Sequence, residues 1–135
     1  MDVIAMTREL GKALQQDDRY IAYMLAKQVN DSDKELQDNI ARFEELRIEL
    51  GSAMSAENTD DDKLQSLDKE LKETYQKIMK NQNMIVFTAA QKSLESLVTN
   101  MNQIISLCAN GEDPDTCQPP QSGCSGSCAS CGGCG

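Results

Sequence analysis

Apolar residues recur every three or four positions along most of the first 110 residues, and this is the period of an α-helix. A first helix is expected over about residues 3–16, and Asp17 or Asp18 can cap a second. A polar break over residues 57–62 separates the third helix from a fourth. No segment alternates apolar and polar residues as a strand does. The predicted fold class is therefore all-α, a small bundle of about five helices with long antiparallel helices.

Local signals refine the helix boundaries and the faces that should be buried. Ser32-Asp33-Lys34-Glu35 is typical of a capping box, with Ser32 as the N-cap of the third helix and Glu35 at its third position. Thr59 or Asp60 is expected to cap the fourth helix. The apolar positions of the first four helices that are expected to face inward are Val3, Met6, Leu10, Leu14, Ile21, Met24 or Leu25, Val29, Leu36, Ile40, Phe43, Leu46, Leu50, Met54, Leu64, Leu67, Leu71, Tyr75 and Ile78.

The last helix has the most regular pattern, with apolar positions that step by three and four residues through three heptads. Val98 and Ile105 widen this stripe, which favours a helix that buries one side within the chain and another side against a partner. A monomeric bundle that covers all of its own helices is the alternative. Gly111 is expected to end the helix. The heptad positions are Phe87, Ala90, Leu94, Leu97, Met101, Ile104 and Cys108.

The composition changes abruptly after residue 110. Residues 111–135 contain six glycines, five cysteines and three prolines, and they have no lysine, arginine, leucine, isoleucine, valine or aromatic residue. Such a segment cannot offset its ordering entropy by burying apolar surface. We therefore predict a helical domain over residues 1–110 and an irregular Cys/Gly/Ser-rich tail over residues 111–135 that a bound metal organises.

The cysteines of this tail are candidate metal ligands. Their C-x3-C-x2-C-x2-C spacing has overlapping C-x2-C pairs, which resemble iron–sulfur ligation more than the two separated pairs of structural zinc. A 4Fe–4S cluster needs four cysteines; zinc, a cuprous thiolate centre and the absence of any specific metal are the alternatives. Cys108 ends the heptad seam, so it can also be a small core residue. The predicted ligands are Cys124, Cys128, Cys131 and Cys134, with Cys108 and Cys117 as further candidates.

An energy comparison supports a metal in the tail. Ordering the eleven residues 124–134 costs about 11–22 kcal/mol, at about 1–2 kcal/mol per residue. Structural zinc in finger peptides returns about 10–16 kcal/mol. Because the cost of ordering and the free energy of metal binding are comparable, a metal can order this tail. Ligands supplied by a partner would lower the cost, since fewer tail residues would need to become ordered.

Composition and charge exclude several classes of protein. The absence of histidine excludes Ser-His-Asp and Cys-His catalysis as well as His-ligated zinc. A net charge of −9 argues against direct binding of nucleic acid. No apolar segment is long enough to span a membrane and the N-terminus lacks a secretory signal, so we expect a cytoplasmic location, where thiols stay reduced. Cys128-Ala129-Ser130-Cys131 lacks the strand and helix that would activate an oxidoreductase thiol, so no enzyme is expected.

A set of segments and single residues recurs along the helical part of the chain, namely Arg8-Glu9-Leu10-Gly11-Lys12-Ala13-Leu14, Tyr20-Ile21-Ala22-Tyr23, Phe43-Glu44-Glu45-Leu46, Leu71, Asn81, Phe87, Ala90 and Leu94. In these segments the chain resembles the YlbF/YmcA family of bacterial regulators. The resemblance covers about residues 1–108 and rests on helices and apolar positions, and the Cys/Gly-rich extension is similar to that of many members from Gram-positive bacteria.

The resemblance implies a small all-helical protein that associates with paralogous helical proteins and with a further partner, and the widened stripe of the last helix leaves self-association open beside it. It implies roles in competence, sporulation and biofilm control, a link to the endoribonuclease RNase Y and mRNA maturation, and 4Fe–4S clusters. Together with the acidic charge, it predicts a non-enzymatic regulatory adaptor whose effect on RNA passes through a partner nuclease. A zinc- or copper-binding structural protein without a redox role is the alternative.

Overall fold

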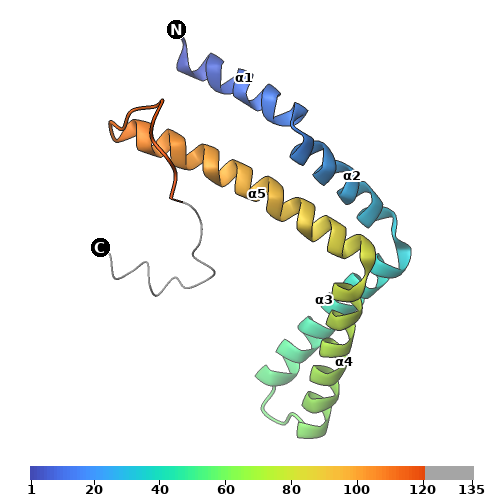
Figure 1. Ribbon diagram of the computed structural model, residues 1–135. Coiled ribbons are helices and arrows are strands. Elements are labelled where there is room, and N and C mark those ends of the chain that lie inside the picture. The colour runs from blue at the N-terminus through green and yellow to red at the C-terminus, as the bar shows by residue number, and fades with distance from the viewer. Residues whose placement is uncertain (121–135) are drawn as a thin grey trace. The chain divides into compact units, whose positions relative to one another are not determined.

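The computed structural model describes residues 1–120, and these residues form five α-helices and no strands (Figure 1). The all-α fold class with about five helices is therefore confirmed. The chain divides into two compact units, residues 1–94 and residues from 95 onward, and α5 runs through the boundary. The helices are α1 (Val3–Gln16), α2 (Asp18–Ser32), α3 (Lys34–Ser55), α4 (Asp61–Lys80) and α5 (Gln82–Ala109).

A short polar side chain caps the start of every helix. Asp2, Asp17, Asp33 and Asp60 each accept a hydrogen bond from a backbone N–H in the first turn, at 2.8–3.0 Å, and Asn81 Oδ1 accepts one from the N–H of Met84 at 3.1 Å. These bonds satisfy donors that have no partner inside the helix, and a carboxylate there also interacts favourably with the helix dipole. The expectation that Asp60 caps the fourth helix is confirmed.

The predicted capping box is wrong by one residue. Ser32 is the last residue of α2, and its hydroxyl donates back to the carbonyl of Gln28 at 2.9 Å. Asp33 is the single residue between α2 and α3, and its Oδ1 accepts the N–H of Leu36 at 3.0 Å. A one-residue connection leaves only Asp33 outside the helical conformation, so only Asp33 can serve as the cap.

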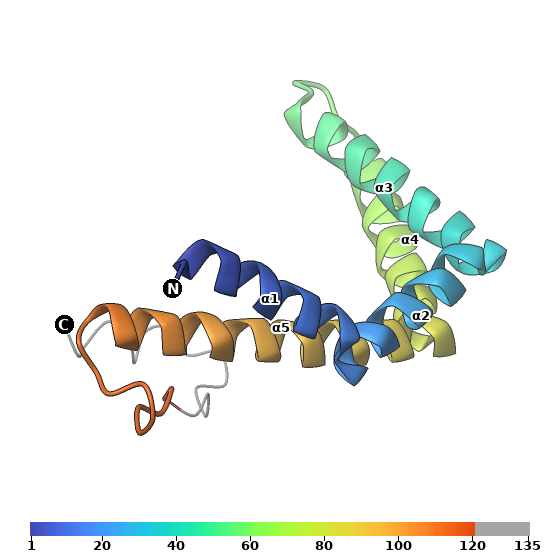
Figure 2. The same ribbon diagram turned by 90° about the horizontal axis from the view of Figure 1, so that it is seen from above.

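Helices α3 and α4 form an antiparallel hairpin that holds the main apolar core, and both views show them side by side (Figures 1 and 2). Leu46, Ala53 and Leu67 are buried at its centre. On its surface, Arg42 of α3 donates from Nε and Nη2 to Glu70 Oε1 of α4, at 3.0 and 2.9 Å. The partly buried side chains packed around the centre are Leu50, Leu64 and Leu71.

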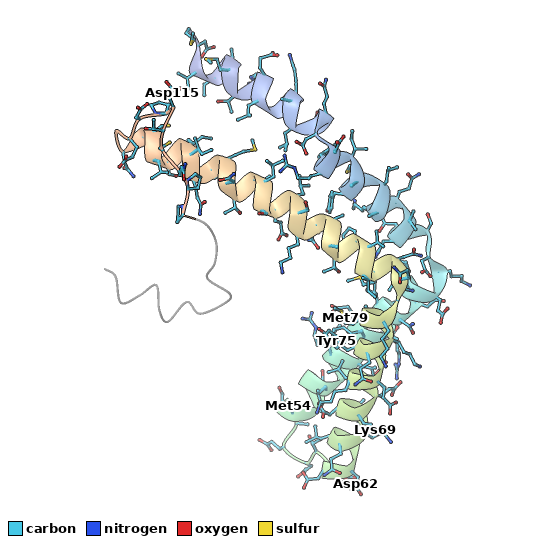
Figure 3. All side chains as sticks on the ribbon, viewed as in Figure 1. Met54, Asp62, Lys69, Tyr75, Met79 and Asp115 are labelled. Carbon is cyan, nitrogen blue, oxygen red and sulfur yellow. The ribbon has the colours of Figure 1, made fainter. Side chains whose placement is uncertain are left out.

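Two expected core positions of the hairpin are instead exposed. Met54 is 70% exposed and Tyr75 is 51% exposed (Figure 3), whereas their helices bury Ala53 and Thr74. A pair of helices covers only one narrow stripe of each member, so residues one position beside the stripe remain outside. The Tyr75 ring still lies 5.9 Å from the ring of Phe43.

The expected inward faces of α1 and α2 are wrong as well. Helix α1 has no buried residue, and α2 buries only Ala26 and Asn30. The periodicity identified the apolar face of each helix correctly, but within residues 1–94 nothing large covers that face. The large apolar side chains that remain exposed on these helices are Val3, Ile4, Met6, Leu10, Ile21, Met24, Leu25 and Val29.

A cluster of polar side chains joins the α2–α3 connection to the α4–α5 connection. Asp33 Oδ2 accepts hydrogen bonds from the amide nitrogens of Asn81 and Asn83, both at 3.0 Å. The Gln37 amide donates to the backbone carbonyl of Asn30 at 2.9 Å and to its side-chain oxygen at 3.1 Å. We call Asn30, Asp33, Gln37, Asn81 and Asn83 the polar junction.

The hairpin core predicts a large effect of truncating Leu46, which is fully buried. Leu46→Ala should lower the free energy of unfolding by about 2–5 kcal/mol, because it removes buried methyl groups and leaves a cavity. Ile48→Ala is the matched control, since Ile48 is 64% exposed on the same helix and should change the free energy by less than about 0.5 kcal/mol. Urea unfolding followed by circular dichroism measures both, and equal losses would contradict the assigned core.

The polar junction predicts a specific dependence of stability on pH. Hydrogen bonds from the N–H of Leu36 and from the amides of Asn81 and Asn83 lower the pKa of Asp33. A carboxylate with a lowered pKa stabilises the fold above the pKa of the unfolded chain, about 3.9, and this contribution is lost as the pH falls toward the folded pKa. Asp33→Asn should therefore lower the urea midpoint at neutral pH, and its difference from the parent chain should shrink only below about pH 4.

Asp31→Asn controls for the loss of one negative charge beside the junction. Asp17, whose pKa the hydrogen bonds from Arg19 lower to about 2, is present in every variant and cancels in the comparison. A difference between the parent chain and Asp33→Asn that stays constant throughout acid titration would contradict a role for the Asp33 charge.

Candidate functional site

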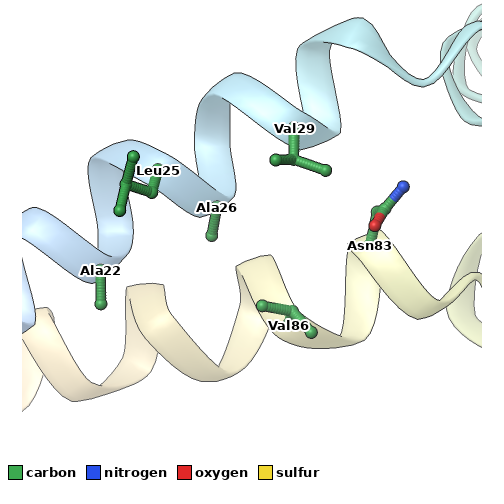
Figure 4. Close-up of a pocket in the computed structure, with 6 residues that line it drawn as sticks. All are labelled: Ala22, Leu25, Ala26, Val29, Asn83 and Val86. Atoms are coloured by element: carbon green, nitrogen blue, oxygen red, sulfur yellow. The ribbon is translucent and has the colours of Figure 1, made fainter.

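An open apolar groove lies between α2 and the first part of α5 (residues 82–94). It has a volume of about 410 Å³, and Figure 4 shows Ala22, Ala26 and Val86 in the space between the two helices. The small side chains of the two alanines leave room that Leu25 and Val29 border. We call this feature the α2 groove; its lining residues are Ala22, Leu25, Ala26, Val29, Asn83 and Val86.

Neighbouring contacts hold the two helices that form the α2 groove. The ring of Tyr23 on α2 lies 5.6 Å from the ring of Phe87 on α5, in a tilted arrangement that is favourable for aromatic pairs. At one end, the amide of Asn83 is bonded to Asp33 and thus belongs to the polar junction. No charged side chain lines the groove. Its chemistry therefore suits an apolar protein surface and offers no group for acid–base catalysis.

A second feature lies at the end of α5, within the unit that begins at residue 95. Gly111 adopts a φ of +94°, its N–H donates to the carbonyl of Cys108 at 3.0 Å, and the N–H of Glu112 donates to the carbonyl of Leu107 at 3.0 Å. This pair of bonds is the Schellman motif that ends many helices, and it needs a residue that tolerates positive φ. The expectation that Gly111 ends the helix is confirmed.

A tight turn that begins at Asp113 follows the helix end. The Asp113 carbonyl accepts the N–H groups of Thr116 at 3.2 Å and of Cys117 at 2.8 Å, and the Asp113 side chain accepts the N–H of Asp115 at 3.0 Å. The turn brings the chain back, so that Cys108 is close enough to raise the pKa of the Cys117 thiol, and Cys117 Sγ donates to the carbonyl of Pro114 at 3.9 Å. Both cysteines are free thiols and half-buried. We call Cys108 and Cys117 the thiol pair.

The surroundings of the thiol pair disfavour a free thiolate. Burial raises the pKa of Cys117 most, followed by the neighbouring Cys108 thiol and the negative charges of Glu112 and Asp113. No lysine or arginine follows Lys92 in the sequence, so no basic side chain of this segment stabilises a thiolate. A protonated thiol is a weak nucleophile, so this arrangement does not favour thiol catalysis, and a metal would have to displace the thiol proton in order to bind there.

Of the six cysteines that the sequence predicted as candidate ligands, the structure brings together Cys108 and Cys117, the thiol pair. Over residues 1–120, no three side chains of Cys, Asp or Glu are arranged to hold a metal ion by themselves. The proximity of Cys108 and Cys117 was not predicted, although Gly111 and the Asp113-Pro114 dipeptide are both turn signals. The four principal predicted ligands lie outside the described residues, namely Cys124, Cys128, Cys131 and Cys134.

Comparison with known proteins identifies the family. The family model described as "Control of competence regulator ComK, YlbF/YmcA" matches residues 3–107, which include all of α1 to α4 and most of α5. No curated protein and no solved structure matches the chain. None of the helices over residues 1–120 combines the length and the hydrophobicity that a membrane span requires. The chain belongs to the YlbF/YmcA family of competence regulators.

Proposed function

We propose that the protein is a non-enzymatic regulatory adaptor that associates through its helices with partner proteins and binds an iron–sulfur cluster through its C-terminal cysteines. Membership of a regulator family supports the non-enzymatic role. The observation that carries the adaptor role is the uncovered apolar face of α1 and α2, on which no functional group for catalysis lies. In this role, the protein contributes to the control of competence.

The uncovered face supports association because it is unusual in a monomer. Leu25 is 59% exposed and Val29 is 51% exposed, and both border the α2 groove. Exposed apolar surface of this kind marks protein interfaces, since its removal from water stabilises the complex by about 25 cal/mol per Å². Single exposed apolar residues scattered over a surface would not indicate an interface, but Leu25 and Val29 lie on one face of α2 and border one groove.

The occupant we propose for the α2 groove is a second copy of this chain. The groove lies between two helices and has no charged lining residue, so two copies can meet through the same surface without repulsion between like charges. An isologous contact of this kind also tolerates the net charge of −9, because the acidic residues remain outside the apolar contact. A paralogous helical protein with a similar apolar face is the other outcome of the test below.

The thiols support a metal centre in the same protein. The chain has no histidine, so its soft ligands are thiolates, and thiolates select a soft metal ion or an iron–sulfur cluster. The described thiol pair fits such a centre in chemistry and supplies at most two of the four ligands that a 4Fe–4S cluster takes. A zinc- or copper-binding structural protein without a redox role remains the second candidate, and it rests on the same thiols.

Any effect on RNA passes through a protein partner in this proposal. The chain has 22 acidic and 13 basic residues, and Lys72, one of the lysines on α4, is paired with Asp68 at 2.8 Å. Phosphate binding needs a surface dominated by Lys and Arg, which this chain does not offer. A partner nuclease would supply the RNA contacts, while this protein supplies an apolar docking face.

Association through the α2 groove can be tested by light scattering after size-exclusion chromatography. The parent chain should be a dimer, and Leu25→Glu should weaken it by at least about tenfold, because it would bury a charge in the interface. Ile48→Glu is the matched control, since Ile48 is 64% exposed on α3 and lies outside the groove. A monomeric parent chain would overturn self-association and point to a paralogous partner, and an equal effect of both variants would overturn the assigned groove.

The metal centre can be tested by anaerobic purification followed by iron, sulfide and zinc analysis. A cluster should give a coloured protein with iron and inorganic sulfide in equal amounts, and a variant with serine at all four principal tail cysteines should lose both. A colourless protein with one zinc per chain would overturn the cluster and favour the structural alternative, while the adaptor role would stand.

A further inference from the structure

We propose that the α3–α4 hairpin carries a second docking site, which binds an acidic segment of a different protein through one apolar side chain of that segment. The inference rests on the proposed adaptor role and adds to it a second interface and the chemistry of the partner. An adaptor that joins proteins needs two surfaces, and the α2 groove is the first of them. The second combines an aromatic pocket with a row of lysines on α4.

An open pocket of about 350 Å³ lies between α3 and α4. The rings of Phe43 and Tyr75 lie 5.9 Å apart and are tilted toward each other by 41°. Tyr75 is 51% exposed, and Met79, one turn further along α4, is 39% exposed (Figure 3). We call this feature the hairpin pocket; its lining residues are Phe43, Leu71, Lys72, Tyr75 and Gln76.

The lining of the hairpin pocket suits a side chain of another protein. Leu71 packs against the buried core of the hairpin, so this side of the pocket is held in place. Tyr75 offers an apolar ring together with a hydroxyl group at the surface, and tyrosines of this kind are enriched among the residues that dominate binding in protein interfaces. Small-molecule sites enclose most of their ligand, whereas this pocket is an open hollow between two helices.

A row of lysines borders the hairpin pocket. Lys69, Lys72 and Lys80 are separated by three and eight residues, so they lie along one face of α4. With a rise of 1.5 Å per residue, the row is about 17 Å long. Lys72 also lines the pocket, and its pair with Asp68 is 73% and 46% exposed. Such an exposed pair contributes little to stability, so a carboxylate of a partner can replace Asp68. We call Lys69, Lys72 and Lys80 the lysine row.

The charge of the site favours an acidic partner. Residues 69–80 contain four lysines and two glutamates, and one of these, Glu70, is paired with Arg42 at 2.9 Å. Glu44, which follows Phe43, is paired with Arg47 at 2.9 Å. The site is therefore a basic region in a chain of net charge −9, and complementary charge selects the partner.

The anchor of this partner comes from a different protein. The two most acidic runs of the chain itself, residues 57–62 and residues 112–115, contain no large apolar residue. A second copy of the chain therefore does not supply from these runs an acidic segment with an apolar anchor.

Fluorescence anisotropy with a labelled peptide and the full chain tests this inference. The probe is an amphipathic peptide of about twelve residues, the length of the lysine row, with leucines three or four residues apart and glutamates at its other positions. The same peptide with lysines in place of the glutamates is its control. The glutamate peptide should bind at least about tenfold more tightly than the lysine peptide, and added salt should weaken its binding. Equal binding of the two peptides, or no saturable binding of the glutamate peptide, would overturn the site.

Variants of the hairpin assign the bound peptide to the pocket and to the lysine row. Tyr75→Ala and Lys72→Glu should each weaken binding of the glutamate peptide by at least about tenfold. Met54→Ala and Lys63→Glu are the matched controls and should bind as the parent chain does, because Met54 does not line the pocket and Lys63 lies in the first turn of α4, before the row. All four side chains are exposed, so circular dichroism should show an unchanged helix content. Equal losses in the site variants and the controls would contradict the assigned surface.

Two further measurements separate the other occupants. A labelled single-stranded RNA of about the same length should not bind, and RNA binding that Tyr75→Ala weakens would overturn a protein partner, since aromatic rings and lysines also bind single strands. Tyr75→Ala should leave the mass from light scattering unchanged, and a lower mass would assign the pocket to a second copy. Leu25→Glu should bind the glutamate peptide as the parent chain does, so a failure of the hairpin site is distinguished from a failure of association through the α2 groove.

Discussion

The carboxylate of Asp33 is the interaction on which the rest of the helical unit depends. It caps α3 through the N–H of Leu36 and at the same time accepts the amides of Asn81 and Asn83, which follow α4. The connections before α3 and after α4 are one residue each, so neither has slack to adjust its direction by itself. One negative side chain with four lone-pair sites therefore links the start of α3 and the end of α4, which together form the open end of the hairpin, to α2 and to the start of α5.

This coupling explains how a unit with a small core can still present a defined apolar surface. The buried apolar side chains lie mainly in the hairpin, while α1 buries none and α2 buries one small alanine and Asn30. Within residues 1–120, every buried side-chain nitrogen and oxygen has a hydrogen-bond partner, so the polar junction adds direction without leaving unsatisfied groups. The apolar face of α2 is thus held in place by polar contacts at its end and by the Tyr23–Phe87 ring pair, and it remains free to contact another protein.

The sequence predicted the helices well because their period and caps are local properties. Val3, Gln16, Asp60 and Gly111 mark boundaries that short-range patterns specify. The burial of Met24, Leu25, Val29 and Met54 was wrong, because periodicity shows which face of a helix is apolar and gives no information about what covers it. The cap of α3 was misassigned because α2 continues through Ser32 and leaves Asp33 as the only residue between the two helices, and the local pattern did not show where α2 ends. The contact between Cys108 and Cys117 depends on a glycine turn and an aspartate turn in succession, each recognisable alone.

One helix carries two of the features that we assign to function. Val86 of the α2 groove and Cys108 of the thiol pair belong to α5, which continues without a break from Gln82 to Ala109. The hydrogen bonds that close this helix run through the backbone of Cys108, so the turn at Gly111 fixes the position of this thiol, and the tail that follows has no part in fixing it.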